Sequence, residues 1–123
     1  MVRKWWTRWE VERWNRKLNR TAFNDEYYGC LQARAYYNKA MLSAKDKKLK
    51  TFCAYMIAVC DRNFDQYTWL IANNDKYYDQ YQGKIKGIKD FGFKGIDREY
   101  YNDLVEECET YQSFIKQYDR KVN

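Results

Sequence analysis

The sequence predicts an all-α fold, a single domain over residues 1–123 built as a bundle of about five helices. Three observations favour this class. The 123 residues contain no proline, the residue that most strongly breaks a helix. Apolar side chains recur at helical spacing through most of the chain. The chain, with 46% apolar residues, is also long enough to bury one core without a metal or a disulfide.

A first helix is predicted from about Arg3 to Arg20, and its apolar side chains fall on two opposite faces. Val11, Trp14 and Leu18 form a narrow stripe that is typical of a core-facing side. The other side carries three rings followed by three guanidinium groups, the composition of a contact surface. We call this side the Trp/Arg face, and it comprises Trp5, Trp6, Trp9, Arg13, Arg16 and Arg20. The competing interpretation is that the other helices simply bury these rings.

Three further helices are predicted before residue 83. The first begins after Phe23 with Asn24 as its N-cap and runs to Ala44. The next covers about 46–60, and its second half, TFCAYMIAVC, is apolar all round, which predicts the most buried helix. A turn is predicted at residues 61–63. A fourth helix then follows from Phe64 to Tyr81, with Asn74 interrupting its apolar stripe.

The stretch GKIKGIKDFGFKG, residues 83–95, predicts a loop between the fourth and fifth helices. It supplies four lysines that could contact a phosphate group: Lys84, Lys86, Lys89 and Lys94. The fifth helix is predicted to start at Asp97 as N-cap, with Ile96 packing on Tyr101 as a hydrophobic staple. Its early turns are acidic and its last turns basic, as the helix dipole favours.

The net charge of +6 is unevenly distributed. Residues 1–20 sum to +5, and the segments 45–60 and 83–96 each sum to +3, whereas 61–82 sums to −2 and 97–123 to −3. This alternation predicts one basic and one acidic face. A basic face suits a nucleic acid or a nucleoprotein; an ordinary mixed surface is the other interpretation.

The residue types argue against catalysis and against a bound metal or cofactor. The chain has no histidine, the commonest general base and metal ligand. Its four cysteines include no C-x-x-C pair, and each falls on an apolar stripe, so buried thiols are expected. Acid pairs at helical spacing, Asp61/Asp65 and Asp75/Asp79, are interpreted as solvated surface. We therefore expect no catalytic residue, no metal and no cofactor.

What remains is a binding protein. Trp, Tyr and Arg dominate interface energetics, and the composition suits an AT-rich phage-type gene. The favoured hypothesis is a small inhibitor, anti-CRISPR-like in role, that docks through the Trp/Arg face on a host protein or nucleoprotein complex. One alternative is an accessory protein that binds single-stranded RNA or DNA directly, because rings interleaved with cations suit base stacking and phosphate neutralisation. A second is a structural homo-oligomer, such as a homodimer.

No targeting segment and no membrane span are visible in the sequence. The longest apolar run, 52–60, is much shorter than a spanning helix needs, and charges interrupt the N-terminal stretch. The expectation is a soluble cytoplasmic protein without a membrane partner.

Overall fold

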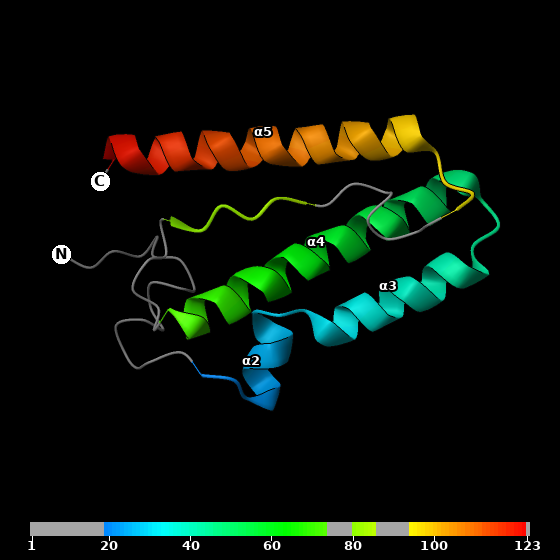
Figure 1. Cartoon of the computed structure of the whole chain (residues 1–123). Coiled ribbons are helices and arrows are strands. Elements are labelled where there is room, and N and C mark those ends of the chain that lie inside the picture. Colours follow the sequence, from blue (N-terminus) through cyan, green and yellow to red (C-terminus); the bar gives the residue numbers. More distant parts are fainter. Residues whose placement is uncertain (1–18, 74–79, 86–93, 123) are drawn as a thin grey trace.

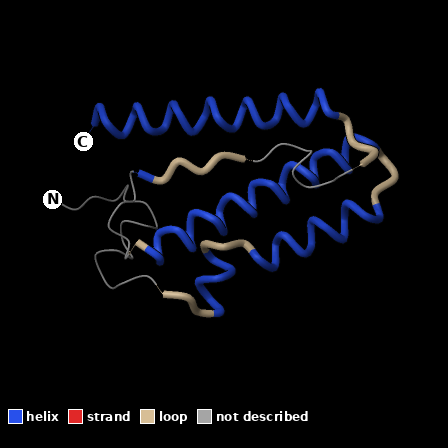
Figure 2. The backbone as a smooth tube through the Cα atoms, in the orientation of Figure 1, coloured by secondary structure: helices blue, strands red, loops and turns tan. Residues whose placement is uncertain are grey.

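The structure, a computed structural model, describes residues 19–73, 80–85 and 94–122, with side chains described as far as Phe114. It is mostly helical, and no strand occurs in these ranges. Four helices follow one another along the chain: α2 (Ala22–Tyr27), α3 (Leu31–Ser43), α4 (Lys47–Ala72) and α5 (Arg98–Val122) (Figures 1 and 2). The all-α class is therefore confirmed. The helix predicted from Arg3 lies outside the described residues as far as 18, and Asn19 and Arg20 are not helical.

The second predicted helix is two helices, separated at residues 28–30. Thr21, and not Asn24, is the first N-cap: its hydroxyl accepts a 3.0 Å hydrogen bond from the Asn24 amide. The break requires glycine at position 29, because a Cβ there would lie 2.5 Å from the Asp25 carbonyl oxygen. Cys30 follows in the left-handed region at φ 58°, and α3 starts directly after it. The chain thus passes from α2 into α3 through three residues.

The turn predicted at residues 61–63 is wrong, because α4 runs unbroken for 26 residues. The polar side chains that suggested a turn bond to other segments instead. Asp61 pairs with Arg34 of α3, Arg62 donates to the Gly83 carbonyl, and Asn63 donates to the Cys30 sulfur. The third and fourth predicted helices are consequently one helix. It ends at Ala72, so Tyr81 belongs to a non-helical segment and not to the helix predicted for it.

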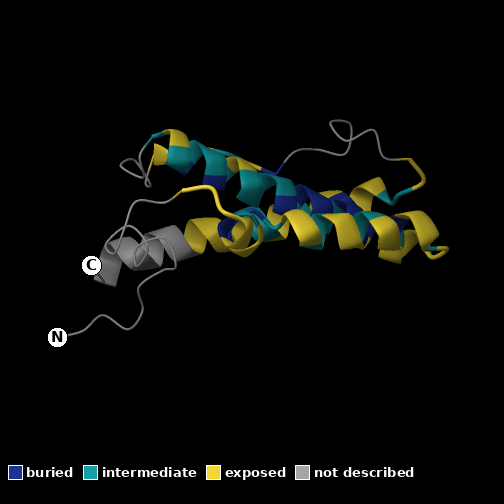
Figure 3. Ribbon diagram, turned by 90° about the horizontal axis from the view of Figure 1, so that it is seen from below, coloured by how far each residue is buried: buried dark blue, intermediate teal, exposed yellow. Residues whose placement is uncertain are grey.

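The core lies along α4. Its first cluster joins small and apolar residues of α4 to side chains from α3, α5 and segment 80–85: Met41, Cys53, Ala54, Ile57, Ala58, Ile85 and Tyr101. A second cluster of Tyr28, Tyr67 and Leu70 lies near the end of α4. Figure 3 shows the buried residues gathered where the helices meet and the exposed ones on their outward faces. The prediction that the TFCAYMIAVC helix is the most buried holds for Cys53, Ala54, Ile57, Ala58 and Cys60, which are all buried.

Helices α4 and α5 run parallel and start side by side, whereas α3 runs antiparallel to α4 (Figure 1). The Asp97 amide donates a 2.7 Å hydrogen bond to the hydroxyl of Thr51, a fully buried residue of α4. The Asp97 carboxylate caps α5 through the Tyr100 amide at 3.0 Å, as predicted. Ile96 packs against the cluster that contains Tyr101, which agrees with the predicted staple.

Of the predicted glycine–lysine loop, residues 83–85 and 94–95 are described and are not helical, whereas 86–93 lie outside the described residues. Segment 80–85 lies on α4 through two buried side chains, Tyr81 and Ile85. The Tyr81 hydroxyl donates a 2.8 Å hydrogen bond to the Asp65 carboxylate. Among the described helices, none combines the length and the apolarity that a membrane crossing requires.

Candidate binding surface

Helices α2 and α3 lie at one outer edge of the bundle (Figure 1), and both carry exposed large apolar side chains. The exposed fractions are 66% for Phe23, 41% for Tyr27, 41% for Leu31 and 61% for Tyr36. We call these four residues the α2–α3 outer surface. Phe23 and Tyr27 stack with their ring centroids 5.1 Å apart, and Tyr36 accepts a hydrogen bond from Gln32 on the same helix. An exposed pair of stacked rings such as Phe23 and Tyr27 is typical of a protein-binding surface.

The α2–α3 outer surface is held in place by the buried side of α2. Tyr28 is buried against Tyr67, with ring centroids 6.0 Å apart, so Phe23 and Tyr27 are left facing outward on the short helix. On α3, Met41 is buried against α4 while Leu31, Tyr36 and Leu42 are exposed. The spacing of apolar residues does not reveal this surface, because it predicts one helix over residues 24–44 and marks only the inward stripe of that helix.

Arg20 is the one residue of the Trp/Arg face that the structure describes. Its guanidinium group makes two hydrogen bonds to the Asp25 carboxylate, at 3.0 and 2.8 Å, and lies 5.3 Å from the centroid of the Phe64 ring. These hydrogen bonds, followed by one from Tyr67, hold the pKa of Asp25 below its usual value of 3.8. Arg20 therefore links the segment just before α2 to both α2 and α4. The other five residues of the face, Trp5, Trp6, Trp9, Arg13 and Arg16, lie outside the described residues.

Two of the four predicted loop lysines are described, and both are exposed. Lys84 follows Gly83, whose carbonyl accepts a 3.0 Å hydrogen bond from Arg62 in the second half of α4. Lys94 lies four positions before Arg98, the first residue of α5. Lys86 and Lys89 lie outside the described residues.

The structure does bring two basic segments together where α4 and α5 begin. The Thr51–Asp97 hydrogen bond joins these starts, and the Lys48 ammonium lies 5.5 Å from the centroid of the Tyr100 ring. The exposed cations of this basic end are Lys45, Lys47, Lys48, Lys94 and Arg98. Asp46, Asp97 and Glu99 lie among them, the first two as helix caps. Charge sums along the chain indicated both segments, but only the parallel pairing of α4 and α5 makes them neighbours.

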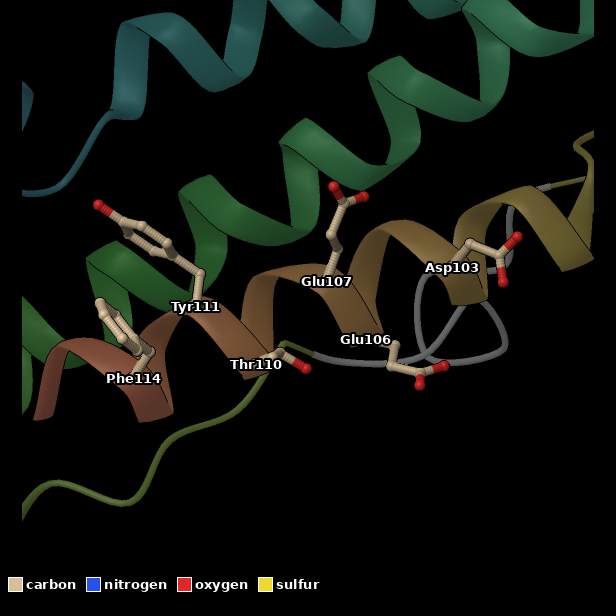
Figure 4. Close-up of a pocket in the computed structure, with 6 residues that line it drawn as sticks. All are labelled: Asp103, Glu106, Glu107, Thr110, Tyr111 and Phe114. Carbon is tan, nitrogen blue, oxygen red and sulfur yellow. The ribbon is translucent and has the colours of Figure 1, made fainter. Parts of the chain in front are cut away.

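An acidic surface lies further along α5. An open hollow of about 590 Å³ is lined by Asp103, Glu106, Glu107, Thr110, Tyr111 and Phe114. Figure 4 shows Tyr111, Phe114 and Glu107 projecting from one side of α5, with Thr110 and Glu106 on the other. The two rings are about as exposed as Phe23, at 63% and 60%. This surface provides a matched comparison for the rings of α2 and α3.

None of the four cysteines, all of which the structure describes, is disulfide-bonded, and Cys53 and Cys60 are buried as expected. Cys30 and Cys108 are half-buried, so the expectation of buried thiols holds for two of the four. The nearby Cys30 side chain, followed by burial, raises the pKa of the Cys60 thiol. Sequence spacing gave no sign that residues 30 and 60 lie near each other.

The acid pair Asp61/Asp65 is used within the fold, since Asp61 pairs with Arg34 and Asp65 accepts from Tyr81. Asp75 and Asp79 lie outside the described residues. In the part of the chain that the structure describes, no three cysteine, aspartate or glutamate side chains form a group that could hold a metal ion.

The described residues thus define a small all-α bundle with an apolar edge, a basic end and an acidic helix face. No protein-family model, curated protein or solved structure matches this chain.

Proposed function

We propose that this protein is a non-catalytic binding protein that docks on another protein through the α2–α3 outer surface together with the Trp/Arg face predicted from the sequence. The observation that carries the proposal is the exposure of the stacked rings of Phe23 and Tyr27 on α2 and of Leu31 and Tyr36 on α3. Burying such side chains against a partner would stabilise the complex. Arg20, the last residue of the predicted Trp/Arg face, lies two positions before α2 in the chain.

The partner we propose is a host complex that handles nucleic acid, which the protein inhibits in the cytoplasm in the manner of a small phage-encoded anti-CRISPR protein. This step rests on composition: a short, basic, ring-rich chain without proline or histidine. A surface of rings next to arginines contacts both protein and nucleoprotein well, because rings bury a large area and guanidinium groups make directional bonds.

The test is affinity purification of the tagged protein from a bacterial host lysate, with and without nuclease. Wild type is compared with the Phe23→Ala/Tyr27→Ala double variant and with a matched control, Tyr111→Ala/Phe114→Ala. The proposal expects a defined partner that survives nuclease, is lost with the first double variant and is kept with the control. Retention by the first variant and loss by the control would instead assign the contact to α5.

A second candidate function is direct binding of single-stranded nucleic acid, and the basic end of α4 and α5 favours it. Five exposed cations there, Lys45, Lys47, Lys48, Lys94 and Arg98, suit a phosphate backbone. The measurement is binding of a labelled single-stranded oligonucleotide as salt is varied. Lys47→Gln/Lys48→Gln should weaken binding and flatten its salt dependence, whereas binding that is unaffected by this variant would exclude the basic end.

The remaining alternative is a homo-oligomer that covers the same rings. Sedimentation of wild type and of Phe23→Ala/Tyr27→Ala at several concentrations distinguishes it. A dimer that the double variant converts to a monomer would place a second copy of the chain on this surface, in place of a host protein.

A further inference from the structure

The turn between α2 and α3 is pressed against α4. A Cβ atom on Gly29 would lie 2.9 Å from Cδ1 of Phe64 and 3.2 Å from Cδ2 of Tyr67, so the backbone approaches α4 more closely than any larger residue would allow. The next residue, Cys30, has φ 58° and ψ 32°, a conformation that non-glycine residues seldom adopt. The position of Cys30 relative to α4 is therefore set by packing on one side.

Two polar contacts fix the position of Cys30 relative to α4 from the other side. The Asn63 side-chain amide donates to the Cys30 sulfur at 3.6 Å. One turn further along α3, the Arg34 guanidinium forms an ion pair with the Asp61 carboxylate. Cys30 is thus held between contacts to residues 61, 63, 64 and 67 of α4.

Those α4 residues surround Cys60. Asn63, Phe64 and Tyr67 follow it by three, four and seven positions, so they share its side of the helix. The Cys60 side chain is 4% exposed, and the nearby Cys30 side chain raises the pKa of its thiol. The close approach of the α2–α3 turn to this side of α4 makes the two cysteines neighbours, one half-buried and one buried.

We propose that Cys30 and Cys60 are a site of oxidative modification, at which a peroxide converts the two thiols into one disulfide that joins the α2–α3 turn to α4. This inference is independent of the proposed docking function. The contacts of Gly29, Asn63 and the Arg34–Asp61 pair keep Cys30 beside the part of α4 that carries Cys60.

The reaction balances with a peroxide as the only oxidant. The Cys30 sulfur attacks one peroxide oxygen, the O–O bond breaks, and a sulfenic acid and one water form from the Cys30 thiol and hydrogen peroxide. The Cys60 sulfur then attacks the Cys30 sulfur and the S–O bond breaks. The departing hydroxide takes the Cys60 proton and leaves as a second water. Two electrons pass from the thiols to the peroxide.

The order of the two steps follows from exposure. Cys30 is half-buried and within reach of solvent, whereas Cys60 is only 4% exposed, so the peroxide reaches Cys30 first and Cys60 acts second. Cys53 lies within the core cluster and Cys108 packs against that cluster, which makes both suitable controls.

The experiment treats fully reduced, full-length protein with a small excess of hydrogen peroxide. The protein is then denatured, its remaining thiols are alkylated, and the intact mass and the peptide map are recorded. Wild type should lose two of its four alkylatable thiols and the mass of two hydrogen atoms, with the peptides of Cys30 and Cys60 linked. Cys30→Ser should abolish the link, whereas Cys53→Ser and Cys108→Ser should keep it.

A second readout does not depend on the variants. The disulfide closes a loop of about 30 residues, so the oxidised wild type should melt at a higher temperature than the reduced protein, and dithiothreitol should reverse the shift. Retention of all four thiols after peroxide, a link through Cys53 or Cys108, or a disulfide between two chains on a non-reducing gel would each overturn the proposal.

Discussion

The hydroxyl of Tyr67 donates a 2.8 Å hydrogen bond to the carboxylate of Asp25, which joins the second half of α4 to α2. Tyr67 is completely buried, while Asp25 also takes both hydrogen bonds of Arg20. One carboxylate thus connects the entering chain, the first described helix and the central helix. The packing of the whole α2 region depends on this contact.

Truncation of Tyr67 should therefore be among the most destabilising changes. Tyr67→Ala leaves a large cavity beside Tyr28 and Leu70, and we expect a loss of about 3–5 kcal/mol in the free energy of unfolding. Tyr67→Phe removes only the hydroxyl and should cost less. Urea denaturation followed by circular dichroism measures both, with exposed Tyr111→Phe as the control. A Tyr67→Ala variant as stable as the control would show that this cluster is not a core.

We expect the free energy of unfolding to fall at alkaline pH because of the same Tyr67 phenol. Burial, and then the hydrogen bond to Asp25, raise the pKa of Tyr67 to about 12 from an ordinary value of 10.0. The folded state holds this proton more tightly, so the contribution is complete below pH 10 and disappears as the pH rises towards 12. The free energy of unfolding, measured in urea from pH 8 to 11.5, should fall above pH 10. Tyr67→Phe should flatten that fall, and an unchanged slope would contradict the assignment.

Gly29→Ala should destabilise the protein by about 2 kcal/mol or more, because the new methyl group overlaps the Asp25 carbonyl and the Phe64 ring. Gly95→Ala is the matched control. Gly95 has φ 72° and nothing within 4 Å of its Cβ position, so only backbone strain of about 1 kcal/mol is expected there. Thermal melts of the two variants show which substitution is the more destabilising. A larger loss at Gly95 would mean that the α2–α3 turn can move away from α4.

Thr51→Val tests how α5 is attached to α4. The Thr51 hydroxyl is the acceptor for the Asp97 amide, and valine keeps the shape but leaves that amide without this acceptor, at a cost of about 1–3 kcal/mol. Thr68→Val in the same helix removes a hydroxyl that only donates to carbonyls of its own helix, and it should change stability little. Equal urea midpoints for the two variants would show that the bond does not stabilise the pairing.

A further prediction concerns the helix expected from about Arg3 to Arg20, with a core stripe on one side and the Trp/Arg face on the other. Residues 1–18 lie outside the described range, so this prediction rests on the sequence. Trp14→Ala should cost about 3–5 kcal/mol as a buried large-to-small change. Replacing Trp5 and Trp6 by alanine should cost about 1 kcal/mol or less and abolish partner binding. Thermal melts combined with pull-down separate the two effects. If Trp5→Ala and Trp14→Ala are equally destabilising, the two-sided interpretation is wrong.

Composition and periodicity were enough to predict the all-α class, the buried stripe around Ile57 and the Asp97 cap. These features depend on local properties: the lack of proline, apolar spacing near 3.6 residues, and a side chain that bonds to an amide three positions away. Such signals act within one or two helical turns, so a single sequence carries them.

The tertiary structure alone decided where helices break and which surfaces meet. Asp61, Arg62 and Asn63 favour a turn locally, yet their bonds to Arg34, Gly83 and Cys30 satisfy these polar groups and let α4 continue. Gly29 lets the turn after α2 approach α4 so closely that no Cβ would fit there. The approach of Cys30 to Cys60 and the basic end of α4 and α5 likewise join segments far apart in the chain. Contacts of this kind depend on three-dimensional packing, which local patterns in the sequence do not encode.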